Sequence, residues 1–167
     1  QILKLARRAE RAVVVGGGIT ALEIVEGLAS RRVQTDYFLR GDRYWSNILD
    51  ETESRIVEQR LKEDGIQIRY HTDLAEIAGS QGRVCGAITA DGRYYPCQIV
   101  AIAIGVKPRT ELAAAAGLDI ERGVLVNQYL QTSDADIFAA GDIAQTYDPF
   151  TGQSVLDTLW GPAREQG

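Results

Sequence analysis

Residues 12–23 read AVVVGGGITALE, in which a run of valines leads into consecutive glycines and then into a helix-forming stretch. A short β-branched run is typical of a strand that is buried on both faces. Residues 19–31 carry apolar side chains at roughly helical spacing, so a helix is expected directly after the glycines. Gly16, Gly18 and Ala21 therefore fit GxGxxG/A in the strand–turn–helix context that a dinucleotide-binding turn requires.

Each small residue of this motif has its own physical role. The first glycine permits a tight turn, and the second lets a diphosphate approach the backbone without meeting a Cβ atom. The third small residue lets the helix and the strand pack closely. The helix N-terminus then presents free N–H groups and a partial positive charge of about 0.5 to the phosphates. The alternative is a glycine turn that serves packing alone, and the strand and helix around it favour the nucleotide site.

The segments on either side of the turn predict an α/β fold. Strands are expected at 12–15, 34–39, 66–70 and 98–104. Helices are expected at 1–10, 19–31 and from a capping box at Asp50 and Glu53 to about Leu61, with Gly65 as the C-terminal glycine. Alternating strands and helices favour a parallel sheet with right-handed crossovers, so the prediction is a Rossmann-like, doubly wound sheet.

The pattern changes after residue 73. Three short runs, 74–79, 83–90 and 93–97, predict an antiparallel three-stranded meander inserted into the doubly wound unit, with Asp91-Gly92 as a hairpin turn. Beyond residue 110 the expected segments are short. They are a helix that ends at Gly117, apolar runs at 124–127 and 137–140, and a helix that begins after Pro162.

The end of the second strand bears on which nucleotide binds. An acidic residue about 20 positions after the first glycine usually binds the ribose 2′-hydroxyl of NAD, and Asp36 has that spacing but lies inside the strand. The strand ends without a carboxylate, and Arg40 and Arg43 follow it. An arginine there accommodates a 2′-phosphate, so NADPH is slightly favoured over NADH. The alternative is that both arginines are solvated loop charges.

Three blocks make the assignment narrower: VVVGGGITALE at 13–23, AIAIGVKPRT at 101–110 and TSDADIFAAGD at 132–142. In order and spacing they resemble the pyridine nucleotide–disulphide oxidoreductase family of flavoproteins with two dinucleotide-binding domains. That family includes the flavin subunits of ferredoxin, rubredoxin and nitrite reductases and the NADH oxidases. The resemblance implies an FAD-dependent enzyme that passes a hydride from NAD(P)H to flavin and on to an undefined acceptor.

The resemblance also implies roles for individual residues. Those expected to surround the NAD(P) diphosphate are Gly16, Gly17, Gly18, Ile19, Thr20 and Ala21. Glu23 matches a helix carboxylate near the nicotinamide–flavin junction, and a plain helix surface charge is an equal alternative. Leu39 matches the position of the NAD-selecting acid, and an arginine often follows it in NADPH-using members, as Arg40 does here. Gly105 and Pro108 match a turn beside the nicotinamide half.

The third block concerns FAD. Asp142, preceded by Gly141, resembles the aspartate that binds the FAD ribityl chain, with a simple turn aspartate as the alternative. The implied domains are an NAD(P)H-binding Rossmann-like domain at 1–110 and a returning, incomplete part of the FAD domain at 111–167. The implied partners are the remaining FAD-domain and interface segments of a parent chain.

The chain is expected to be a piece of a longer protein, because it begins with Gln1 and contains no methionine. Alone it is expected to bind NAD(P) weakly, to retain no FAD and to be inactive. One alternative is a non-catalytic NAD(P)-binding sensor or regulatory module, which would not need the block at 132–142. Another is a one-cofactor dehydrogenase, which would need a proton-handling residue that the single histidine, His71, is badly placed to provide.

Composition excludes several other functions. A net charge of −5 leaves no basic footprint for nucleic acid, and no apolar run approaches the roughly 20 residues of a membrane span. Cys85 and Cys97 fit neither a CxxC redox pair nor a zinc site, so no metal is expected. No catalytic side chain is expected either, because the cofactors carry the redox chemistry. Two thiols without a secretory signal make a reducing cytoplasm the expected location. A charged helix face is expected to be solvated; it comprises Glu51, Glu53, Glu58, Glu63 and Asp64.

Overall fold

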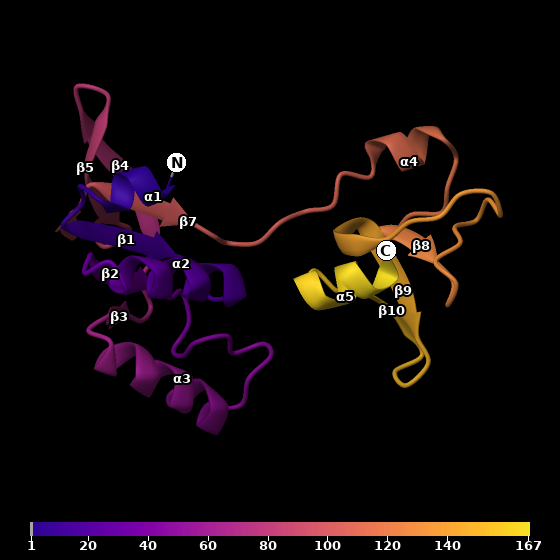
Figure 1. Cartoon of the computed structure of the whole chain (residues 1–167), viewed down its shortest axis with the longest axis horizontal. Coiled ribbons are helices and arrows are strands. Elements are labelled where there is room, and N and C mark those ends of the chain that lie inside the picture. Colours follow the sequence, from indigo (N-terminus) through magenta and orange to yellow (C-terminus); the bar gives the residue numbers. More distant parts are fainter. Residues whose placement is uncertain (1) are drawn as a thin grey trace. The chain divides into compact units, whose positions relative to one another are not determined.

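The computed structural model describes residues 2–167 and divides the chain into two compact units (Figure 1). The first unit ends at Gly105, and the second comprises Val106–Gly167. The glycine turn lies in the first unit and the Gly141-Asp142 pair in the second. The assignment of residues 1–110 to NAD(P)H binding and of 111–167 to an FAD domain stays a prediction.

A four-stranded parallel sheet forms the centre of the first unit, in the order β3-β2-β1-β7. Its strands are β1 (Arg11–Val15), β2 (Gln34–Phe38), β3 (Gln67–Arg69) and β7 (Ile99–Ile102). The helices of this unit are α1 (Ile2–Ala6), α2 (Ile19–Ala29) and α3 (Glu51–Glu63). The strand–helix–strand order and the parallel pairing confirm the predicted Rossmann-like α/β sheet.

Strand β1 is buried on both faces, as its valines predict. Val14 belongs to a cluster with Val25 and Leu28 of α2, whereas Val13 packs with Phe38 in a separate cluster. Because successive side chains of a strand point to opposite faces, these two clusters lie on the two sides of the sheet. Full burial of each such side chain contributes roughly 1.5–3 kcal/mol, which fixes the strand beneath the glycine turn.

An antiparallel meander covers the face of the sheet that the helices leave free. Its strands, in the order β4-β5-β6, are β4 (Leu74–Ser80), β5 (Arg83–Thr89) and β6 (Tyr94–Pro96), which confirms the predicted insertion. Ala87 and Cys97 of this region join the cluster of Val13 and Phe38. The Phe38 and Tyr95 rings meet edge to face with their centroids 4.8 Å apart.

Helix α3 begins at the predicted capping box. The Glu53 N–H donates to Asp50 Oδ1 at 2.8 Å, and the Asp50 N–H donates to Glu53 Oε2 at 2.9 Å. The helix ends before Gly65, whose φ of +83° lies in the left-handed region that favours glycine. Both ends of α3 are therefore set by local sequence, and this fixes the helix that supports the loop after β2.

The second unit contains a three-stranded sheet in the order β10-β9-β8. Its elements are α4 (Glu111–Ala115), β8 (Val124–Val126), a 3-10 turn η1 (Gly141–Ile143), β9 (Ala144–Asp148), β10 (Gln153–Leu156) and α5 (Trp160–Gln166). The apolar run at 137–140 forms only an isolated bridge between Phe138 and Gln131. Helix α5 begins before Pro162 rather than after it, and the sequence pattern does not indicate β9 or β10.

Within residues 2–167, no helix combines the length and apolar character needed to cross a bilayer.

Candidate nucleotide-binding site

The turn after β1 requires glycine at its first position. Gly16 has a φ of +145°, and a Cβ atom built on it would lie 2.1 Å from the Ala103 carbonyl oxygen and 3.2 Å from the Ala21 Cβ. Ala21 itself is fully buried. A larger residue at either position would push α2 away from the strands, so the first and third small residues of the motif serve packing and turn geometry.

Gly18 differs from Gly16 because the protein's own packing does not require it. It is the N-cap of α2 with a φ of −113°, a conformation open to any residue. A Cβ atom built there would have only the Trp45 Nε1 within reach, at 4.0 Å, and one built on Gly17 would have no neighbour within 4 Å. The bare backbone at this point leaves space for a ligand to approach the main chain.

The N-terminus of α2 presents a row of free donors. Among residues 2–167, the main-chain N–H groups of Gly17, Gly18, Ile19, Thr20 and Ala21 donate no hydrogen bond, and the first internal bond of the turn runs from Leu22 N–H to the Gly18 carbonyl. The helix has neither a capping side chain nor an acidic residue in its first turn. Free donors, the positive end of the helix dipole and a side-chain-free approach together fit a diphosphate.

The carboxyl end of β2 lies beside this turn, since β2 pairs with β1. Asp36 lies inside β2, as expected, and pairs with Arg69, with Oδ1 and Nε 2.8 Å apart. Leu39 is 1% exposed and packs in the core, so it presents no side chain to a ligand. No carboxylate therefore occupies the position where NAD-binding folds usually place one.

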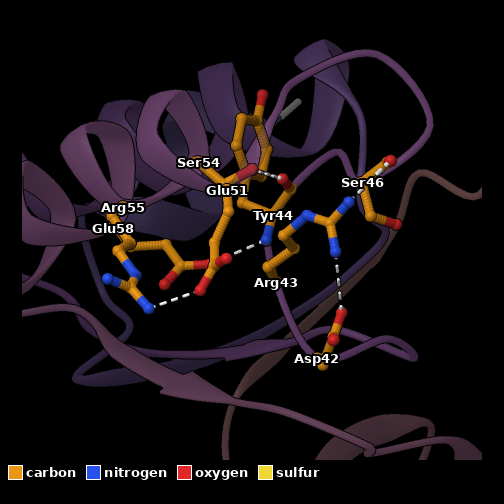
Figure 2. Close-up of polar contacts among 8 residues, drawn as sticks. All are labelled: Asp42, Arg43, Tyr44, Ser46, Glu51, Ser54, Arg55 and Glu58. Atoms are coloured by element: carbon orange, nitrogen blue, oxygen red, sulfur yellow. Dashed lines mark hydrogen bonds and ion pairs between the residues drawn. The ribbon is translucent and has the colours of Figure 1, made fainter.

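Arg40 and Arg43 lie in different surroundings. Arg40 is largely exposed and pairs with Asp73, with Nε and Oδ1 3.1 Å apart. Arg43 is more buried, donates to the Ser46 carbonyl at 3.2 Å and lies 3.6 Å from Asp42, as Figure 2 shows. Its buried Nε atom has no hydrogen-bond partner in the part of the chain that the structure describes.

The loop that carries Arg43 is fastened to α3 by two buried polar side chains (Figure 2). The Tyr44 N–H donates to Glu58 Oε1, and the Ser54 hydroxyl donates to the Tyr44 carbonyl, each at 2.7 Å. Glu58 Oε2 also accepts from the Tyr70 hydroxyl at 2.5 Å. Burial and then this carboxylate raise the pKa of Tyr70 above its usual range.

The expectation that the charged face of α3 is solvated is wrong for Glu58, which is buried. Only 6% of the residue is exposed, because it lies on the side of the helix that also carries buried Ser54 and Leu61. The spacing of Ser54, Glu58 and Leu61 places all three on one helical face, a signal that was available in the sequence. A carboxylate so placed needs donors, and the Tyr44 N–H and Tyr70 hydroxyl supply them.

The remaining predicted residues of the first unit lie near the turn or at the unit's end. Thr20 and Glu23 are exposed on α2 and border a shallow groove that Ile2 and Leu3 of α1 also line. Gly105 ends the unit with a φ of +110°.

Residues 103–110 contain no assigned helix, strand or hydrogen-bonded turn, and Pro108 belongs to the second unit. The expected place of Gly105 and Pro108 beside the nicotinamide stays a prediction.

The predicted flavin residues lie on the 3-10 turn of the second unit. Gly141 has a φ of +76°, and its N–H donates to Gln166 Oε1 of α5 at 2.7 Å. The Asp142 carboxylate is exposed and accepts no hydrogen bond from any residue in 2–167. A free carboxylate on a fixed turn can accept hydrogen bonds from hydroxyl groups of a ligand, which is the chemistry expected of a ribityl-binding aspartate.

The described part of the chain holds no cluster of three or more metal-ligating side chains, and Cys85 and Cys97 are free thiols.

Comparison with known proteins places this chain in a family. Residues 1–167 match the family described as pyridine nucleotide-disulphide oxidoreductase. The nitric oxide reductase FlRd-NAD(+) reductase of Aeromonas hydrophila is 36% identical over 139 residues, covering 83% of this chain and 36% of that protein. The rubredoxin-NAD(+) reductase of Ectopseudomonas oleovorans is 30% identical over 148 residues, covering 88% and 38% respectively.

A solved structure agrees with these sequence relatives. The ferredoxin reductase of Rhodopseudomonas palustris superposes with a TM-score of 0.90 at 30% identity, covering 98% of this chain and 40% of that one. The chain thus spans well under half the length of these relatives. It belongs to the pyridine nucleotide-disulphide oxidoreductase family.

Proposed function

We propose that this chain is the pyridine-nucleotide-binding part of an FAD-dependent NAD(P)H oxidoreductase. The bound cofactors supply the hydride chemistry, and the residues of this chain bind and orient them. The family membership and the relatives named as NAD(+) reductases support the reaction class. The acceptor of the electrons belongs to the whole protein and is left unassigned.

The bare N-terminus of α2 is the observation that carries this proposal. A turn that served packing alone would need glycine at Gly16 but not at Gly18, where an N-cap serine, asparagine or aspartate would stabilise the helix by a few tenths of a kcal/mol. A diphosphate accounts for the missing cap, because its oxygens accept from the same N–H groups. Residues 17–21 then bind the diphosphate of NAD(P)H.

We further propose a modest preference for NADPH over NADH. Leu39 supplies no acceptor for a ribose 2′-hydroxyl, and Arg40 and Arg43 follow it with guanidinium groups that can pair with a 2′-phosphate. The Arg40–Asp73 pair is exposed, and such pairs contribute only about 0–1 kcal/mol, so a phosphate can displace Asp73.

The second unit is proposed to contribute to the FAD site. Asp142 would accept hydrogen bonds from the ribityl hydroxyl groups, and the Gly141–Gln166 bond would hold the turn in place. FAD binding would then require the remaining FAD-domain and interface segments of the parent protein. Two free thiols are compatible with the proposed cytoplasmic location.

Calorimetric titration of the chain with NADH, NADPH and ADP-ribose tests the nucleotide proposal. ADP-ribose should bind, because it contains the diphosphate, and NADPH should bind a few-fold more tightly than NADH. Arg40→Glu should reverse that ranking, with Arg60→Glu on the exposed face of α3 as a matched control that leaves it unchanged. Absence of binding by all three compounds would refute the proposal, and wild-type preference for NADH would refute the role of Arg40.

A different assay distinguishes the proposed oxidoreductase from a non-catalytic NAD(P)-binding sensor. Full-length protein carrying FAD should reduce an artificial acceptor with NAD(P)H, whereas a sensor would bind nucleotide without doing so.

A further inference from the structure

Trp45 adopts an unusual backbone conformation in the loop between β2 and α3. Its φ is +48°, in the left-handed region that side chains other than glycine rarely occupy. Such a residue persists only when its surroundings hold it there, and these positions are concentrated at ligand sites. The conformation alone assigns no role, so the contacts of the loop and of the indole ring decide the question.

The loop around Trp45 is held on both sides by hydrogen bonds. Immediately before it, the Tyr44 N–H and carbonyl are bound by Glu58 and Ser54 of α3 (Figure 2). Immediately after it, the N–H groups of Ile48 and Leu49 both donate to the Trp45 carbonyl at 2.9 Å. The Tyr44 and Trp45 rings also pack with centroids 5.9 Å apart. The loop therefore presents Trp45 in a fixed place before any ligand arrives.

The indole nitrogen lies at the glycine turn. Trp45 Nε1 is the nearest atom to the position of a Gly18 Cβ, at 4.0 Å. The ring is only partly buried, and its N–H donates no hydrogen bond to any residue in the described range 2–167. A free side-chain donor thus stands beside the free main-chain donors of residues 17–21, and all of these groups favour an acceptor-rich anion.

We propose that Trp45 is a further nucleotide-binding residue, whose indole N–H donates to an oxygen of the diphosphate or the adjoining ribose. Its ring forms a wall of the site on the adenosine side, because the loop follows the carboxyl end of β2, where Rossmann folds bind the adenosine ribose. This inference rests on the proposed nucleotide site and adds a side chain that the glycine motif does not contain. The ligand it recognises is the ADP half shared by NADH and NADPH.

Intrinsic fluorescence tests the placement of Trp45. The chain has two tryptophans, so Trp160→Phe in the second unit leaves Trp45 as the only one. Titration of this variant with ADP-ribose should change the intensity or wavelength of its emission with saturation. Nicotinamide mononucleotide, which lacks the adenosine half, should leave the emission unchanged at the same concentrations. Emission unaffected by saturating ADP-ribose would overturn the inference.

Trp45→Phe tests the hydrogen bond, because it keeps an aromatic ring in the loop and removes the indole N–H donor, together with part of the ring surface. Loss of one hydrogen bond should weaken ADP-ribose binding about threefold to tenfold for a ribose acceptor and about tenfold to a hundredfold for a phosphate oxygen, as measured by calorimetry. Trp160→Phe should bind as the wild type does, and thermal unfolding of both variants reports whether each is folded. Equal affinity of folded Trp45→Phe and wild type would overturn the assigned hydrogen bond.

The wild-type titration distinguishes the two proposals. If the wild type binds no ADP-ribose, the proposed function fails and this inference fails with it. If the wild type binds but neither Trp45 emission nor the Trp45→Phe affinity changes, only the role of Trp45 is overturned.

Discussion

Substituting Gly18 with alanine should separate ligand binding from folding. An added Cβ atom would meet only the Trp45 Nε1 at 4.0 Å, and the φ of −113° suits alanine. The N-cap preference for glycine over alanine, about 0.5–1 kcal/mol, opposes a gain of about 0.4–1 kcal/mol from a stiffer unfolded chain. The free energy of unfolding should therefore change by less than about 0.5 kcal/mol.

The same methyl group should interfere strongly with the nucleotide. It occupies the space through which a diphosphate would reach the N–H groups of α2, and hydrogen bonds to charged groups contribute about 1.5–3 kcal/mol each. Loss of one such bond lowers affinity by a factor of roughly 10 to 100. Urea unfolding measures the free energy of unfolding of the variant, and calorimetry measures its affinity for ADP-ribose.

Two neighbouring glycines provide matched controls. Gly16→Ala puts a Cβ 2.1 Å from the Ala103 oxygen at a φ of +145°, so strain of about 1–2 kcal/mol and overpacking of about 1–3 kcal/mol should destabilise the fold. Gly17→Ala adds a methyl group where no protein atom lies within 4 Å and should leave the free energy of unfolding nearly unchanged. A stable Gly18→Ala variant with wild-type affinity would refute the reasoning.

Three further predictions concern the buried polar groups of the first unit. Tyr37→Phe should raise the free energy of unfolding by about 1 kcal/mol in urea, because the buried Tyr37 hydroxyl has no partner within residues 2–167. Burial, and secondarily Glu26, raises the pKa of Tyr44 to about 12, so the folded state holds this proton more tightly than the unfolded state. The free energy of unfolding should therefore fall between pH 10 and 12, and Tyr44 alone contributes up to about 1.4 kcal/mol per pH unit to this fall. The fall should be less steep in Tyr44→Phe, and an equal slope in both proteins would contradict the raised pKa of Tyr44. Glu58→Ala should cost about 1–3 kcal/mol by leaving the Tyr44 N–H without an acceptor, whereas exposed Glu63→Ala should stay within about 0.5 kcal/mol in the same urea assay.

The parts of the fold that depend on local patterns could be predicted from the sequence. The valines of β1, the glycine turn and the capping box at Asp50 and Glu53 each determine structure within a few residues, and all are found as expected. Asp91-Gly92 likewise forms the turn between β5 and β6, with Gly92 at a φ of +83°. These signals suffice for the parallel sheet and the meander.

Features that depend on tertiary contacts could not be predicted from the sequence. Glu58 looks like a surface charge until the loop after β2 is seen to place the Tyr44 N–H against it. Trp45 gives no periodic signal, because its place beside Gly18 results from that anchored loop. Strands β9 and β10 carry polar residues at many positions, and buried Gln145 is satisfied there by bonds to Glu121 and the Ser154 carbonyl.

The proposed contact between nucleotide and main chain can be tested directly through the amide resonances of residues 17–21. In a titration of isotope-labelled protein with ADP-ribose, followed by NMR, these amides should show the largest chemical-shift changes and should saturate together. Amides of the meander, such as that of Ile88, should remain in place. Saturable binding that leaves residues 17–21 unshifted would contradict the assignment of the glycine turn as the diphosphate site.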